Sequence, residues 1–145
     1  MKFVERIVIN AAQRVIFELT QDYDRRLLWD PFLKEARLVD GAFAAGLGVK
    51  AWCVATNGIG METVYVSYQP PQVTAVSMTS GPFFYDTFAG SWRFKAVTPQ
   101  QTDVVFTYRF VLKRPFRFAT PFMTYILRRS AIKRLSALKQ YVEQT

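Results

Sequence analysis

The 145-residue sequence contains no histidine. Without histidine the protein cannot form Ser-His-Asp or Cys-His nucleophilic pairs, and it lacks the commonest proton shuttle and metal ligand. Any chemistry must therefore use carboxylates, tyrosines, lysines or arginines. We expect neither a metal site nor a cofactor.

Cysteine and long apolar runs are also scarce. The single cysteine, Cys53, excludes an intramolecular disulfide, and its apolar setting in residues 51–55 predicts a small buried side chain rather than a reactive thiol. No apolar run reaches the roughly 18 residues that cross a bilayer, and residues 1–10 alternate as a strand rather than forming a secretory signal. We expect a soluble, cytoplasmic protein, with a peripheral position at a membrane as the alternative.

Lysine and arginine exceed acidic residues by 19 to 11, so the formal net charge is +8. This excess favours anionic partners, although a solvated basic surface is the commoner explanation. With 50% hydrophobic residues and no repeat or linker, the chain is predicted to form one domain, residues 1–145, with a sizeable core. The sequence is compatible with either a monomer or a homodimer.

The apolar pattern predicts a β-rich chain that ends in one long helix. Asn57-Gly58 and Pro70-Pro71 mark turns between strands. The predicted strands cover residues 2–10, 35–39, 47–56, 61–68, 72–80, 84–97 and 102–113. The predicted helices cover residues 11–20, with Asn10 as the cap, a short segment after Asp22, and residues 121–142.

The two long strands alternate most clearly, because side chains point to opposite faces with a period of two. The inward row of the first is Phe84, Asp86, Phe88, Trp92 and Phe94, and that of the second is Val104, Phe106, Tyr108, Phe110 and Leu112. A lone carboxylate in an apolar row is costly unless it is paired or faces a cavity. Asp86 is therefore the candidate catalytic or ligand-orienting residue with Tyr108 as a hydrogen-bond donor, unless Asp86 lies at the solvated rim.

The inward aromatic side chains have two interpretations. They either fill a core against the last helix or line a pocket for an apolar ligand. Under the second interpretation, the predicted ligand-binding residues are Trp52, Phe88, Trp92, Phe106, Tyr108, Phe110, Phe122, Met123, Ile126 and Leu127.

The last helix divides into two segments. Residues 122–127 are apolar almost all round, so they have two faces to cover and could contact a ligand on one of them. In residues 131–142 an apolar stripe with a basic back predicts ordinary packing of little functional consequence, with Arg134 at the stripe's edge, able to snorkel or to reach a carboxylate.

Basic and aromatic residues alternate just before this helix, which suits contact with an anionic membrane surface. Nucleic acid is disfavoured because no RNA-binding motif is present. The residues of this segment are Lys113, Arg114, Phe116, Arg117 and Phe118.

The order of the predicted elements resembles the START-like, or SRPBCC, superfamily of helix-grip proteins related to Bet v 1. The elements that carry this resemblance are a first strand, two short helices with Trp29-Asp30-Pro31, a run of strands with Pro70-Pro71, and a long final helix. Within this superfamily, the local sequence is similar to the coenzyme Q-binding and polyketide cyclase/dehydrase branches. The similar stretches are Gly81-Pro82-Phe83 and Trp92-Arg93-Phe94, followed by Thr102, Val104, Phe106 and Phe110. The resemblance implies an α+β fold in which a seven-stranded curved antiparallel sheet wraps around the C-terminal helix above an apolar cavity. Catalytic residues are not shared across this superfamily, so none is carried over.

Three functions compete. The leading hypothesis is a protein that binds or carries a hydrophobic small molecule, such as a lipid, an isoprenoid quinone or a polyketide-like compound. The second is a cyclase or hydrolase that uses Asp86 as general acid or base. The third is a peripheral membrane-docking module that uses residues 113–118, a role compatible with the first.

Overall fold

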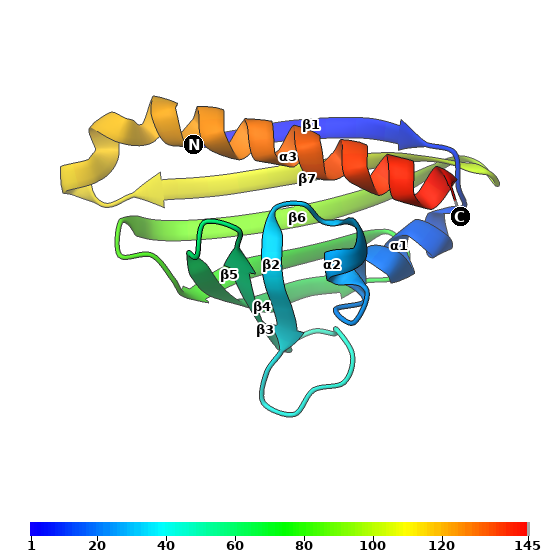
Figure 1. Cartoon of the computed structure of the whole chain (residues 1–145), viewed down its shortest axis with the longest axis horizontal. Helices are drawn as coiled ribbons and strands as arrows, with labels where there is room; N and C mark the ends of the chain where they lie inside the picture. The colour runs from blue at the N-terminus through cyan, green and yellow to red at the C-terminus, as the bar shows by residue number, and fades with distance from the viewer. Residues whose placement is uncertain (145) are drawn as a thin grey trace.

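A curled antiparallel sheet holds one long helix against its concave face in the computed structural model, which describes residues 1–144 (Figure 1). The strands are β1 (Lys2–Ile9), β2 (Leu33–Leu38), β3 (Lys50–Ala55), β4 (Gly60–Gln69), β5 (Val73–Ser80), β6 (Tyr85–Thr98) and β7 (Gln101–Leu112). The helices are α1 (Gln13–Gln21), α2 (Arg26–Trp29), the 3-10 helix η1 (Arg114–Ala119) and α3 (Thr120–Glu143). The predicted α+β helix-grip fold is confirmed.

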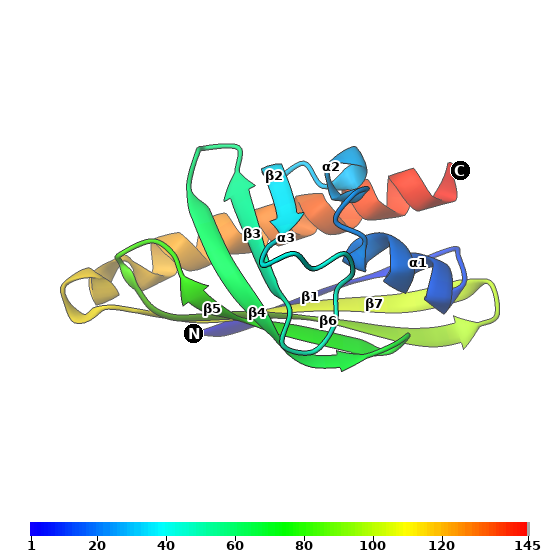
Figure 2. The same ribbon diagram turned by 90° about the horizontal axis from the view of Figure 1, so that it is seen from below.

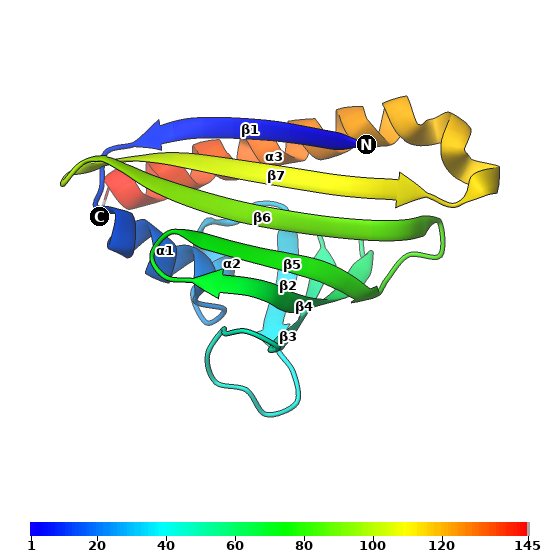
Figure 3. The ribbon, with the colours of Figure 1, turned by 180° about the vertical axis from the view of Figure 1, so that it is seen from behind.

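The order of the strands explains the curl. Neighbours follow β1-β7-β6-β5-β4-β3-β2, so β1 and β2 form opposite edges although α1 and α2 alone separate them in the chain. Viewed from below, β3 and β4 turn away from the direction of β6 and β7 and cross in front of α3 (Figure 2). From behind, no helix of residues 1–144 covers the convex face of the sheet (Figure 3).

The core lies between α3 and the β1, β6 and β7 part of the sheet. One stripe of α3 is buried, as its spacing of three and four residues predicts, and its members are Leu127, Ala131, Leu135, Leu138 and Val142. The inward row of β7 is buried as predicted. Although α3 has 24 residues, no helix in the described part of the chain is long and apolar enough to cross a membrane.

Asp86 does not point inward, so this prediction is wrong, and the alternative of a solvated position at the start of the strand is confirmed. A bulge inserts one residue into β6, because Tyr85 pairs with Leu112 while Thr87 pairs with the adjacent Val111. The extra residue reverses the alternation at the start of the strand. Tyr85 takes the buried position, and Asp86 is exposed to solvent.

Two helix starts also differ from the prediction. Ala12, not Asn10, is the N-cap of α1, and the backbone N–H of Asn10 donates instead to Glu143 Oε2 at 2.8 Å. At the other end of the chain, η1 runs directly into α3, so the helix begins at Thr120 after an N-cap at Ala119. The end of β1 is thus tied to the last turn of α3 beside α1.

Candidate functional site

A cavity of about 290 Å³ separates the first half of α3 from the curled sheet. Side chains from α2, α3 and strands β2 to β7 contribute to its wall. Its volume lies at the lower end of the range of small-molecule pockets, roughly 300 to 1,000 Å³. The concave face is therefore only partly filled by core packing.

Most of the predicted ligand-binding residues line this cavity. They are Phe88, Trp92, Phe106, Tyr108, Met123, Ile126 and Leu127. The rings of Phe106 and Tyr108 pack edge to face with centroids 4.6 Å apart, and those of Trp92 and Phe106 pack at a tilt with centroids 4.5 Å apart. The wall formed by β6 and β7 is consequently rigid and apolar.

Three of the predicted ligand-binding residues lie elsewhere. Phe110 is fully buried in the core, and Phe122 points to solvent with 65% of its surface exposed. Trp52 does not reach the cavity, because its ring lies over Gly60, where an added Cβ would be 2.4 Å from Cζ2 of the indole. Irregular pairing in β4, around Glu62 and Tyr65, makes the inward face of this region impossible to count from the sequence.

The residues proposed for chemistry and for membrane contact are placed as follows. Asp86 is exposed and outside the cavity, whereas Tyr108 lines it. In the basic aromatic segment, Lys113, Arg114, Arg117 and Phe118 are exposed. Phe116 is half-buried, with its ring centroid 5.5 Å from that of Phe83.

The cavity opens beside the first turns of α3. Among its lining residues, Asn57, Ile59 and Ile126 are exposed, and they lie on the β3–β4 turn and on α3. The opposite end is polar and buried, and it is built by α2, the middle of α3 and β7. A ligand would therefore have an apolar mouth and a polar inner end.

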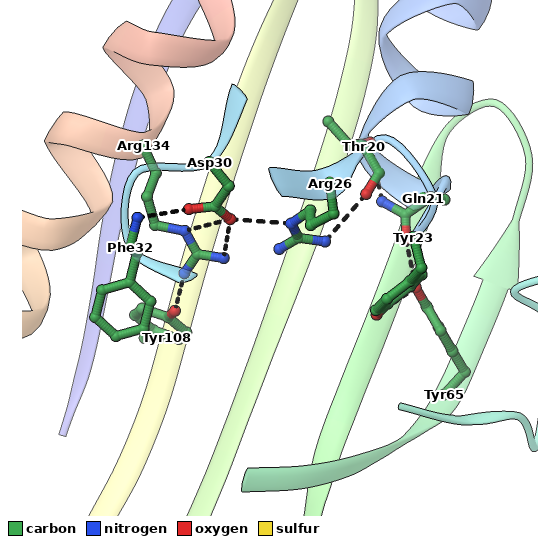
Figure 4. A network of polar contacts seen from close by, with 9 residues as sticks. All are labelled: Thr20, Gln21, Tyr23, Arg26, Asp30, Phe32, Tyr65, Tyr108 and Arg134. Carbon is green, nitrogen blue, oxygen red and sulfur yellow. Dashed lines mark hydrogen bonds and ion pairs between the residues drawn. The ribbon is translucent and has the colours of Figure 1, made fainter. Parts of the chain in front are cut away.

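The polar end is organised around one carboxylate, Asp30, which follows α2 (Figure 4). Asp30 Oδ2 accepts hydrogen bonds from Arg26 Nε at 2.9 Å and from Arg134 Nε and Nη2 at 3.2 and 3.0 Å. Its Oδ1 accepts the backbone N–H of Phe32 at 3.0 Å. Arg134 Nη1 also donates to the hydroxyl of Tyr108, so the network reaches the aromatic wall.

The side chains of Asp30, Arg26 and Arg134 stay charged. Burial raises the pKa of Asp30, but the Arg134 and Arg26 guanidinium groups lower it more, so the pKa lies below its ordinary value. Burial lowers the pKa of both arginines, but Asp30, together with Tyr23 near Arg26 and Tyr108 near Arg134, raises it more, and the pKa of each lies above its ordinary value. Two cations thus share one anion beneath α3.

A second polar group borders the first. Tyr65 donates its hydroxyl hydrogen to Gln21 Oε1 at 2.7 Å, and the hydroxyls of Tyr65 and Tyr23 are 3.2 Å apart. Burial raises the pKa of Tyr23, Tyr65 and Tyr108, so all three phenols are neutral at physiological pH. Cys53 also lines the cavity, and burial raises the pKa of its thiol, in line with an unreactive side chain.

Arg26, Asp30 and Arg134 were missed as site residues. Ordinary packing does not describe all of residues 131–142, because Arg134 lines the cavity and anchors its polar end. The predicted option that Arg134 reaches a carboxylate is confirmed. Two signals were present in the sequence: Arg26 and Asp30 are four residues apart, and Arg134 interrupts the stripe between Ala131 and Leu135. Neither signal identifies its partner in a distant element.

The curled sheet, the long helix and the cavity between them define a START-like helix-grip protein. A family model described as polyketide cyclase / dehydrase and lipid transport matches residues 1–143, and the chain belongs to this family. No curated protein matches the sequence significantly. Members of this family bind hydrophobic molecules or act as cyclases, so a ligand-binding or cyclase role follows for the chain.

Solved structures share this fold at low sequence identity. The Zhui aromatase/cyclase from Streptomyces sp. R1128 has a TM-score of 0.84 and 16% identity over 99% of this chain and 94% of that one. A START superfamily protein from Mycobacterium smegmatis has a TM-score of 0.80 and 12% identity over 99% of this chain and 97% of that one. These likenesses concern the fold alone.

Proposed function

We propose that the protein binds and carries a hydrophobic small molecule, such as a lipid, an isoprenoid quinone or a polyketide-like compound. The observation that carries this proposal is the cavity itself, which is walled by aromatic and aliphatic side chains and open between Ile59 and Ile126. A ligand that removes about 300 Å² of apolar surface from water gains about 7 kcal/mol, before the cost of immobilisation.

The chemistry of the wall favours binding over acid-base catalysis. None of the described lining residues is an aspartate or glutamate, and Asp86 lies outside. The lining tyrosines have raised pKa values and act as neutral hydrogen-bond donors, not as bases. General acid-base catalysis needs a group whose pKa lies near the working pH, and Asp30, with a lowered pKa between two arginines, is not one.

Filling the cavity tests this proposal. Val76 lines the cavity from β5, whereas Val66 of β4 is exposed and outside it. We expect Val76→Trp to lose co-purifying lipophile in native mass spectrometry with solvent extraction, and to lose Nile red binding, while Val66→Trp retains both. Circular dichroism reports whether each variant folds. Nile red binding that is unchanged in a folded Val76→Trp variant refutes binding in the cavity.

A second observation favours docking on a membrane, where a carrier would collect its ligand. Phe83, Phe118, Phe122 and Tyr125 expose most of their surface around η1 and the first turns of α3, close to the cavity mouth at Ile126. Figure 1 shows this segment projecting from one end of the molecule. Arg114 and Arg117 supply positive charge beside these rings, the combination that suits an anionic lipid surface.

Vesicle flotation tests this second role. We expect binding to phosphatidylcholine vesicles that contain phosphatidylserine, and we expect salt to weaken it. Phe118→Ser combined with Phe122→Ser should abolish binding, whereas Phe43→Ser, at a fully exposed phenylalanine of the β2–β3 loop, should not. Equal loss in both variants contradicts a specific docking segment.

A further inference from the structure

The polar end of the cavity has an unbalanced charge. Arg26 and Arg134 are 6% and 5% exposed, and each forms an ion pair with Asp30. Asp30 is the only buried carboxylate in the described chain, and no second carboxylate pairs with either guanidinium there. Two positive groups and one negative group leave one uncompensated positive charge in a low-dielectric site, which is costly for the protein alone.

Hydrogen-bond donors are also in excess at this end. Arg26 uses Nε for Asp30 and Nη1 for the carbonyl of Thr20, but its Nη2 has no partner among residues 1–144 (Figure 4). Arg26 lines the cavity. The hydroxyl of Tyr108 accepts from Arg134 and donates to no described residue, so its hydrogen is available to a ligand in the same cavity.

Trp29 packs behind this end, outside the lining of the cavity. Its indole N–H is buried without an acceptor in the described chain, and its ring lies 5.1 Å from the Arg26 guanidinium carbon. The ring covers the guanidinium, which keeps Arg26 in place by a cation–π contact. This end of the cavity therefore offers fixed donors and a positive charge, with no free anion.

We propose that the natural ligand is an amphiphile with a single carboxylate, whose head binds Arg26 Nη2 and the Tyr108 hydroxyl and whose apolar chain extends toward the mouth at Ile126. This inference rests on the proposed carrier function and names the class of its ligand. One carboxylate brings one negative charge, which balances the site, and its two oxygens can accept from both donors. A neutral alcohol leaves the positive charge uncompensated, and a phosphate monoester brings nearly two negative charges.

The test compares three compounds with the same chain: decanoic acid, decan-1-ol and methyl decanoate. Their affinities are measured at about pH 8, where the acid is ionised, by displacement of the neutral dye Nile red. We expect the acid to bind the wild-type protein at least about tenfold more tightly than the alcohol or the ester, the effect of one charged hydrogen bond.

A pair of neighbouring arginines supplies the matched variants. Arg26→Met removes the excess charge and the unpaired nitrogen but leaves Asp30 paired with Arg134. Arg25→Met removes the same charge from an exposed side chain, 48% accessible, outside the cavity. We expect Arg26→Met to lose the preference for the acid over the alcohol and the ester, and Arg25→Met to keep this preference.

Each outcome separates the two proposals. Nile red binding with equal affinity for all three compounds overturns the carboxylate inference and leaves the carrier function standing. A preference that survives in Arg26→Met overturns the assignment of the head to this arginine. Failure of the wild-type protein to bind the dye or any of the three compounds refutes the carrier function itself. If Arg26→Met does not fold, the wild-type comparison of acid with alcohol still decides the class of ligand.

Discussion

Replacing Asp30 with asparagine should destabilise the protein severely, because one carboxylate neutralises two buried guanidinium groups. Its side chain has no exposed surface, and four hydrogen bonds converge on it, three of them from Arg26 and Arg134. Asparagine keeps the shape and one acceptor oxygen, so the bond from the backbone of Phe32 can survive. It cannot neutralise either cation.

The expected loss is about 3–5 kcal/mol in the free energy of unfolding near neutral pH, the cost of removing one partner of a buried ion pair. The individual bonds are not summed, since they share one acceptor and are strongly coupled. Such a loss is a large part of the roughly 5–15 kcal/mol that stabilises a typical domain. Asp30→Asn should therefore unfold at a much lower urea concentration than wild type.

Asp22→Asn provides the control. Asp22 pairs with Arg25 at 2.8 Å, but both side chains are partly exposed, at 35% and 48%. A surface pair of this kind contributes about 0–1 kcal/mol. Urea titrations followed by circular dichroism, with linear extrapolation, give the free energy of unfolding of wild type, Asp30→Asn and Asp22→Asn. A loss in Asp30→Asn no larger than that in Asp22→Asn refutes the reasoning.

The pH dependence of this difference gives an independent check. The pKa of Asp30 is lowered in the folded protein, so its stabilisation is fully present above the unfolded value of about 4 and is lost as pH falls through the folded pKa. The difference in unfolding free energy between wild type and Asp30→Asn should stay constant from about pH 5 to 8 and shrink below about pH 4. A difference that shrinks with rising pH contradicts the assigned charges.

Two further predictions concern packing. Leu138→Ala should lose about 2–5 kcal/mol of unfolding free energy, because Leu138 is completely buried on the face of α3 that packs on the sheet. Ile132→Ala, on the exposed side of the same helix, should lose less than about 1 kcal/mol. Equal losses in urea titrations would contradict the orientation of α3. Gly60→Ala should lose about 1–3 kcal/mol of unfolding free energy and shift the tryptophan emission, because the added Cβ would lie 2.4 Å from the Trp52 ring. An unchanged melting temperature would show that the ring moves aside freely.

Regular alternation made the long strands predictable. In β7 every second residue from Val104 to Leu112 is buried, and the predicted range of residues 102–113 differs from the strand by one residue at each end. The cavity wall on β6 and β7 followed from the same count, which placed Phe88, Trp92 and Phe106 correctly on the concave face. Counting failed at Asp86, because nothing local in the chain marks the bulge that reverses the face.

By itself, the sequence determined the order of elements, because that order depends on periodicities and breakers that act within a few residues. Its resemblance to a known superfamily implied the helix-grip architecture and the apolar cavity. The sequence also contained every member of the polar end. Only the tertiary structure decided that Asp30, after α2, meets Arg134 from α3, 104 residues away in the chain. That contact depends on how the sheet curls around the helix, and it turns an arginine at the edge of an apolar stripe into part of the cavity's polar end.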